Sequence, residues 1–319
     1  MSATANILAA MPGDYRSRLI DADPEVRRIA VMELPYCDEE DFVSLALSAL
    51  KDSVAAVRAE AAKALEGIEE DGVVKALAAA LHDVDPAVRE ATALSLSELK
   101  DSAMSAHIIP FLTDADAFAR AAAFRALREL RVAGVFDSAL AALLDADDRV
   151  RREAVSVLGY LKNPSGLGEL TRVAMNDPEM DVRRVAVGAL GYATGQQVLP
   201  ALTHALKDSS WQVREEAAST LGKVKPRDAV DNLIQTLSDP YWQVRIRAIR
   251  SLGRMRAREA VVPIVDALGH TMSNVRKESA IALGEIGDPK AIPALEKARQ
   301  DPDPDVRKLA QIALSAIGN

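Results

Sequence analysis

A single unit recurs along the whole chain with a nearly constant period, and this period constrains the fold more than any other feature. When the sequence is aligned on its Val-Arg pairs, ten copies follow at intervals of 31 residues, with one interval of 32. We number these repeats one to ten by their arginines, which are Arg27, Arg58, Arg89, Arg120, Arg151, Arg183, Arg214, Arg245, Arg276 and Arg307. Such a period indicates a solenoid, in which each unit buries its apolar face against its neighbours.

The residues around each arginine predict a helix. A leucine stands seven residues after the arginine in all ten copies, and a valine stands immediately before the arginine in nine. The residue three positions after the arginine has a small side chain. Because successive residues of a helix are rotated by 100°, the valine, the small residue and the leucine share one side of the helix. A shorter apolar segment, such as residues 42–50 or 230–237, comes before each turn, so each repeat is predicted to be helix, turn, helix.

Composition supports an all-α fold. The chain has 319 residues, of which 49% are hydrophobic but only 4% aromatic. Alanine and leucine supply the apolar content, and both suit close-packed helices better than sheets. We therefore predict one solenoid domain over residues 1–319, with an N-terminal capping repeat at 1–37 and a C-terminal repeat at 289–319.

An aspartate stands six residues before the arginine in nine repeats, and His270 takes its place in repeat nine. These aspartates are Asp21, Asp52, Asp83, Asp114, Asp145, Asp177, Asp208, Asp239 and Asp301. The arginine lies on the core side of its helix, where an unpaired charge is costly. We therefore expect aspartate and arginine to form a ladder that pins the turns of neighbouring repeats. In repeat four, Pro110 predicts a kink late in the first helix.

The pattern DPxVRxxAxxALGxIGD, nearly complete in residues 301–318 and 270–288, resembles the short HEAT-like repeat first associated with phycobilisome lyases. The resemblance extends from about Asp14 to Asn319. It implies a right-handed α-solenoid of the armadillo/HEAT type, about ten two-helix repeats long, whose second helices line the concave surface. It is specific for fold and not for function, because one fold carries many functions.

Positions two, five and nine after each arginine lie opposite the core side, so they are expected to face the groove. Tyr160 and Tyr192 occupy equivalent places in adjacent repeats and predict an aromatic floor. The basic residues that follow are Lys223, Arg247, Arg250 and Arg254. Guanidinium groups beside amphipathic rings suit an acidic or phosphorylated protein segment.

The two tryptophans, Trp211 and Trp242, each stand three residues before an arginine, in the turn. Two interpretations stay open: inter-repeat packing or a contact at the groove edge. At the C-terminal end, Leu309 and Ile312 expose apolar surface that a partner or a second copy of the chain could cover.

Bulk charge and motifs restrict the partners. The net charge of −8 opposes general binding to nucleic acid or anionic membranes. Cys37 is the only cysteine, which excludes an internal disulfide, and the first 18 residues lack a secretory leader. No stretch approaches the apolar length needed to span a bilayer. We expect a cytoplasmic protein.

Catalytic motifs are missing from the sequence. The four histidines occupy four different repeat positions and form no HExxH or His-Glu pair, unlike the metal motifs of deoxyhypusine hydroxylase, a HEAT-repeat di-iron enzyme. Phosphate loops and serine-nucleophile elbows are also absent. We therefore predict no catalytic residue, metal or cofactor.

The leading hypothesis is a non-catalytic scaffold or adaptor that binds a protein segment in its groove. The alternative is a subunit resembling bilin lyases, in which Tyr160 and Tyr192 stack on a tetrapyrrole and arginines bind its propionates. Nucleic-acid binding is a third hypothesis, which the acidic net charge disfavours.

Overall fold

The fold is all-α, as the repeat pattern predicts. A computed structural model describes residues 15–36 and 41–318, and those ranges contain helices and turns but no strand. The chain divides into two compact units, Met1–Leu161 and Lys162–Asn319. A single domain over the whole chain therefore stays a prediction. Cys37 lies outside the described residues.

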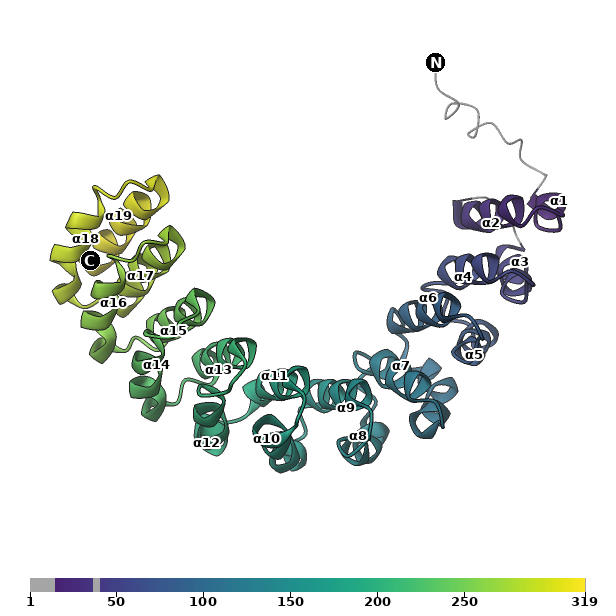
Figure 1. Cartoon of the computed structure of the whole chain (residues 1–319), viewed down its shortest axis with the longest axis horizontal. Helices are drawn as coiled ribbons and strands as arrows, with labels where there is room; N and C mark the ends of the chain where they lie inside the picture. The colour runs from purple at the N-terminus through teal and green to yellow at the C-terminus, as the bar shows by residue number, and fades with distance from the viewer. Residues whose placement is uncertain (1–14, 37–40, 319) are drawn as a thin grey trace, which may run out of the picture. The chain divides into compact units, whose positions relative to one another are not determined.

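Unit 1 holds repeats one to five. Its α-helices are α1 (Tyr15–Arg18), α2 (Pro24–Glu33), α3 (Phe42–Ala49), α4 (Ala55–Ala64), α5 (Asp71–Ala80), α6 (Pro86–Ser97), α7 (Ala117–Leu127), α8 (Phe136–Ala142) and α9 (Asp148–Leu161). Its 3-10 helices are η2 (Leu34–Tyr36), η3 (Ser102–His107), η4 (Ile109–Thr113) and η5 (Ala133–Val135). The second helix of each repeat packs on that of the next, from α2 through α4, α6 and α7 to α9. Figure 1 shows these helices side by side.

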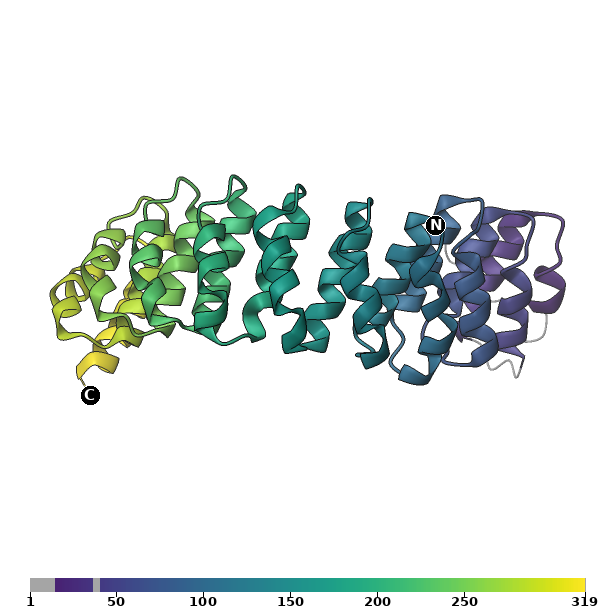
Figure 2. The same ribbon diagram turned by 90° about the horizontal axis from the view of Figure 1, so that it is seen from below.

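Unit 2 holds repeats six to ten. Its helices are η6 (Pro164–Gly166), α10 (Leu167–Asn176), α11 (Met180–Ala189), η7 (Leu190–Tyr192), α12 (Gly195–Ala205), α13 (Trp211–Val224), η8 (Arg227–Ala229), α14 (Val230–Thr236), α15 (Trp242–Arg254), η9 (Arg258–Ala260), α16 (Val261–Ala267), α17 (Ser273–Ile286), η10 (Pro289–Ala291), α18 (Ile292–Ala298) and α19 (Pro304–Gly318). The second helices α11, α13, α15, α17 and α19 form one row, and each contacts the next. Figure 2 shows the helices of the chain from below, without labels, with those of unit 2 in green to yellow.

Small residues let the second helices of unit 2 approach closely. The predicted leucines of repeats seven and eight, Leu221 and Leu252, are fully buried. At Gly253, an added Cβ would lie 2.9 Å from the Cα of Ala282 on the next second helix. Real Cβ atoms do not approach a backbone carbon so closely, so glycine here sets the spacing between α15 and α17.

The predicted ladder is present, and Arg120 shows its geometry. Its Nε and Nη2 both donate to the carboxylate of Asp145 in the next repeat, each at 2.8 Å. Its Nη1 donates to the backbone carbonyl of Asp114 in its own repeat at 2.8 Å. The Asp145 carboxylate also accepts the N–H of Asp147, so each rung joins two turns.

Within the two units, six rungs described by the structure share this bidentate pair. The arginine donates from both Nε and Nη2 to an aspartate 25 residues further on in Arg27–Asp52, Arg58–Asp83, Arg120–Asp145, Arg183–Asp208, Arg214–Asp239 and Arg276–Asp301. The structural role predicted for the repeated charges is therefore confirmed in these repeats.

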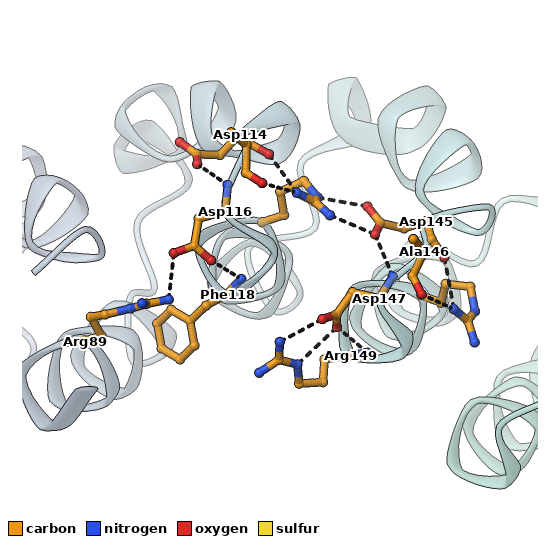
Figure 3. Close-up of polar contacts among 11 residues, drawn as sticks. Arg89, Asp114, Asp116, Phe118, Asp145, Ala146, Asp147 and Arg149 are labelled. Carbon is orange, nitrogen blue, oxygen red and sulfur yellow. Dashed lines mark hydrogen bonds and ion pairs between the residues drawn. The ribbon is translucent and has the colours of Figure 1, made fainter. Parts of the chain in front are cut away.

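Repeat four is irregular, as Pro110 predicts. Its first helix is replaced by two 3-10 segments, η3 and η4. The rung that enters it is also altered, because Arg89 donates to Asp116 at 2.8 Å and stacks over the ring of Phe118 at 4.4 Å (Figure 3). His82 takes the place of that arginine beside Asp114, at 3.0 Å.

Candidate protein-binding site

A pocket opens on the row of second helices in unit 2, between α13, α15 and α17. Its volume is about 320 Å³. The lining residues are Glu215, Trp242, Gln243, Ile246, Arg247, Arg250, Asn274, Lys277 and Glu278. Two of the predicted groove arginines, Arg247 and Arg250, therefore line one pocket, although they share it with acids from the neighbouring repeats.

Both pocket arginines are held by glutamates. Arg247 Nε donates to Glu215 at 2.9 Å, and Arg250 Nε donates to Glu278 at 3.1 Å. The hydrogen bonds from Arg250 to Glu278 raise the pKa of that guanidinium above its ordinary value. Lys277 lies 3.1 Å from Asp303. The pocket is a balanced array of charges and not a purely basic surface.

One polar atom at the pocket has no partner in the described part of the chain. The side-chain oxygen of Gln243, Oε1, is buried and accepts no hydrogen bond. A buried acceptor without a donor costs about 1–3 kcal/mol, so such atoms are few in folded proteins. Asn274, at the equivalent position of the next repeat, lines the same pocket. The pocket wall therefore carries two carboxamides in consecutive repeats.

The remaining predicted basic residues lie outside this pocket. Arg254 ends α15, is exposed, and has no ion-pair partner among the described residues. Lys223 is exposed as well, and its Nζ lies 3.5 Å from Glu216. Of the predicted cations, Arg254 is the one available to an acidic group without displacing an ion pair.

The two predicted tyrosines fall in different units, so the aromatic floor stays a prediction. In unit 1, Tyr160 is 38% exposed, and the guanidinium of Arg128 lies 5.7 Å from its ring centroid. In unit 2, the hydroxyl of Tyr192 donates to the carbonyl of Asn163 at 3.0 Å. Burial raises the pKa of Tyr192. The hydroxyl of Tyr192 thus helps to fix a turn.

The two tryptophans have different surroundings. Trp211 stacks on Tyr241 of the next repeat, with ring centroids 5.5 Å apart and an interplanar angle of 15°. This contact is the inter-repeat packing that one interpretation expects. Trp242 starts α15 and lines the pocket beside Arg247 and Arg250, so its contact with a partner at the groove edge stays a prediction. The repeated sequence WQVR therefore serves packing in one repeat and the pocket in the other.

Positions two, five and nine after the arginines include Glu278 but not Glu215 or the two carboxamides. Glu215 and Glu278 come from the repeats on either side of α15, so they become visible only when positions are compared across neighbours. Gln212, Gln243 and Asn274 occupy the same position in three successive repeats, which was an available signal for the carboxamide row.

Histidines do not form a metal site in the described ranges. His107 Nε2 lies 2.8 Å from Asp71, and His270 lies beside Arg245. Within residues 15–36 and 41–318, no group of three His, Cys, Asp or Glu side chains is placed to hold a metal ion. None of the helices in these ranges is both long and apolar enough for a bilayer span.

The repeats identify the family. A family model described as HEAT repeats matches residues 16–97, 53–128, 136–222, 169–239 and 230–315, which together cover most of the chain. The protein therefore belongs to the HEAT-repeat family, and its fold is an all-α solenoid. A search of the curated proteins finds no match.

Solved structures support the same fold. Escherichia coli YibA is 23% identical, with a TM-score of 0.64 over 84% of this chain and 98% of YibA. An engineered protein is 20% identical, with a TM-score of 0.54 over 96% of this chain and 98% of the other. Kap95 from its complex with Nup1 is 13% identical, with a TM-score of 0.61 over 95% of this chain and 50% of Kap95.

Proposed function

We propose that this protein is a non-catalytic scaffold that binds a segment of another protein along the second helices of unit 2. The observation that carries the proposal is the pocket beside Trp242, in which the buried Oε1 of Gln243 lacks a donor. Rotation of the Gln243 carboxamide toward the pocket would let an N–H group of a bound segment satisfy this oxygen. Aromatic and arginine side chains at a pocket are typical anchors of protein interfaces.

The family supports the class of function. Kap95, whose fold this chain shares, forms a complex with Nup1. Extended rows of helices offer long surfaces with little fixed chemistry, which suits binding better than catalysis. The 31-residue period also supports the short repeat subclass first associated with phycobilisome lyases. With one cysteine, the chain suits a reducing compartment such as the cytoplasm.

We expect the bound segment to be acidic or phosphorylated. Arg254 offers a guanidinium without an acidic partner, at the end of the helix that carries Arg247 and Arg250. An acidic side chain of the partner can also replace Glu215 beside Arg247, or Glu278 beside Arg250, because both ion pairs are partly exposed to water. The exchange would keep both arginines bonded.

Reversing the arginine charges is expected to abolish partner binding. In the variant Arg247→Glu/Arg250→Glu/Arg254→Glu, capture of the partner set from an extract of the native cells should fall at least tenfold, because truncation of an arginine that is an interface hot spot costs about 2 kcal/mol or more. Quantitative mass spectrometry of the captured proteins measures this loss, and circular dichroism checks that the helices persist.

The matched control reverses three cations on the first helices or their ends. Arg172, Lys207 and Arg299 of unit 2 are exposed, and none of them lines the pocket. The variant Arg172→Glu/Lys207→Glu/Arg299→Glu makes the same change in net charge. It should retain the wild-type partner set. Equal capture by the wild type and the pocket variant would exclude this site.

We also propose a homodimer through the C-terminal repeat. A mainly apolar groove of about 370 Å³ lies between α17 and α19, lined by Ile281, Gly284, Glu285, Leu309, Ile312, Ala313 and Ala316. Ile312 is 55% exposed. Because a two-fold contact uses the same patch on both copies, one apolar patch suffices for self-association.

A charge in this groove is expected to separate the dimer. The variant Ile312→Asp should sediment as a monomer at concentrations where the wild type sediments as a dimer, because it places a carboxylate in the apolar contact. Asp305→Asn, an exposed change on the same helix, is the control and should leave the dimer intact. A wild-type protein that is monomeric at tens of micromolar would refute the homodimer.

A further inference from the structure

Repeat nine breaks the aspartate ladder, because His270 stands where nine other repeats have aspartate. In regular rungs such as Arg58–Asp83 and Arg120–Asp145, a carboxylate accepts two bonds from the arginine of the preceding repeat. Arg245 has no such carboxylate. Its Nη1 lies 3.0 Å from Nε2 of His270, and its Nε donates to the carbonyl of Asp239. Its Nη2 has no hydrogen-bond partner in the described part of the chain.

The imidazole of His270 cannot accept all the donors around it. The N–H of Met272 points to Nδ1 at 3.0 Å, while Arg245 Nη1 points to Nε2. A neutral imidazole has one acceptor nitrogen and one N–H. Whichever tautomer forms, one contact sets two donors against each other. A carboxylate in a regular rung accepts all three bonds, as Asp83 does from Arg58 and Asp85. The contact between Arg245 and His270 therefore has more hydrogen-bond donors than acceptors.

A cavity lies directly at this rung. Its volume is about 560 Å³, and both Arg245 and His270 line it. The other walls come from α14, α15, α16, the turn before α17, and α17 itself. This cavity is formed mainly by first helices and the turns that follow them, whereas the proposed protein-binding pocket lies between α13, α15 and α17. The two sites are therefore separate and can be tested independently.

We propose that this cavity binds a carboxylate, which takes the place of the missing aspartate and accepts from Arg245 and His270. A carboxylate presents two oxygens in a plane, the shape that an arginine fork recognises best. The N-terminal end of α17, a 14-residue helix that starts at Ser273, adds favourable partial charge at the same turn.

One acid in the cavity works against the ligand. Asp266 on α16 lines the cavity, is exposed, and forms no ion pair with any described residue. Its negative charge repels an incoming carboxylate. Asp266→Asn should therefore increase the stabilisation of the folded protein by a carboxylate ligand. Removal of the Arg245 guanidinium should abolish that stabilisation.

Thermal unfolding in acetate tests the site. Acetate is the probe, and chloride keeps the ionic strength constant at pH 7. We expect the wild-type Tm to rise saturably, by about 2–6 °C, because a ligand that binds only the folded state stabilises it. His270→Asp fills the rung with its own carboxylate, so its Tm should be higher without acetate and insensitive to acetate. Arg245→Gln should also be insensitive.

The source of the carboxylate is tested by replacing acetate with an octaglutamate peptide at equal carboxylate concentration. A larger shift per carboxylate assigns an acidic partner segment, and an equal shift assigns a small free acid. An acetate response in His270→Asp equal to that of the wild type overturns the proposal. The absence of a response in the wild type also overturns it. The NMR signal of the Met272 amide provides an independent readout, because the proposal requires this signal to shift when acetate is added.

Discussion

Replacing Asp83 with alanine is expected to destabilise unit 1 by about 2–4 kcal/mol, because it leaves a mostly buried guanidinium without its partner. Arg58 donates to Asp83 through Nε and Nη2, both at 2.7 Å, and each side chain is 13% exposed. The variant also loses the bond from the backbone N–H of Asp85 at 2.9 Å. The loss is therefore far larger than for a surface ion pair.

The measurement must be local, because each repeat contacts only its neighbours and a solenoid can open in parts. Hydrogen exchange of the amides in α4 and α6 reports the joint that the Arg58–Asp83 rung spans. Urea unfolding followed by circular dichroism reports the whole chain. We expect faster exchange in these two helices and a lower urea midpoint.

Two further variants distinguish the destabilisation caused by loss of the Arg58–Asp83 ion pair from a general effect of mutation. Glu169→Ala removes an exposed partner of Arg172 and should cost less than about 1 kcal/mol. Arg58→Met/Asp83→Leu removes both charges, so it should recover part of the loss of the single variant. A cost for Asp83→Ala no greater than that of Glu169→Ala would show that the ladder does not hold the repeats together.

The sequence predicted the ladder because its residue types recur at a fixed spacing. A charged residue on the core side of a helix needs a partner, and the aspartate of the turn was available in nine repeats. The structure adds that the carboxylate comes from the next repeat, while the arginine's own turn contributes backbone carbonyls, as at Arg120. Periodicity alone does not say across which joint a side chain reaches.

The candidate site was predicted less completely than the fold. The helical wheel correctly brought Arg247 and Arg250 to one surface, because position on a helix follows from the 100° rotation per residue. It did not reveal that Glu215 and Glu278 hold them, because these acids come from adjacent helices. Contacts between helices depend on helix spacing and rotamers, which the sequence of one repeat does not fix.

His270 shows why a departure from a strong repeat is informative. The sequence marks it as the exception among the aspartates, and only the geometry reveals that Arg245 and Met272 bring two donors to its ring. A local conflict inside an otherwise consistent pattern is where function or strain concentrates. The departure in repeat four is different, because there Asp116 accepts from Nη2 of Arg89 and Phe118 packs under its guanidinium, while its buried Nε has no partner among the described residues.

Acid is expected to lower the stability of the folded repeats, because it protonates the aspartates of the ladder. The hydrogen bonds from Arg27 lower the pKa of Asp52, and those from Arg58 lower the pKa of Asp83. Arg149 lowers the pKa of Asp147 to about 2. Because these pKa values lie below the unfolded value of about 3.9, the stability that the carboxylates contribute is complete above pH 5 and is lost as the pH falls.

The urea midpoint should therefore be nearly constant from pH 7 to pH 5 and should fall as the pH drops through the unfolded pKa of about 3.9 toward the lowered pKa values of the ladder aspartates. Each carboxylate that is protonated only on unfolding adds up to about 1.4 kcal/mol per pH unit to the slope of the unfolding free energy. Several rungs titrate together, so their slopes add. In Asp83→Asn, one titrating group is gone, and stability at pH 7 should fall while the slope below pH 4 becomes shallower. A slope identical to that of the wild type would show that the stability lost in acid comes from carboxylates outside the ladder.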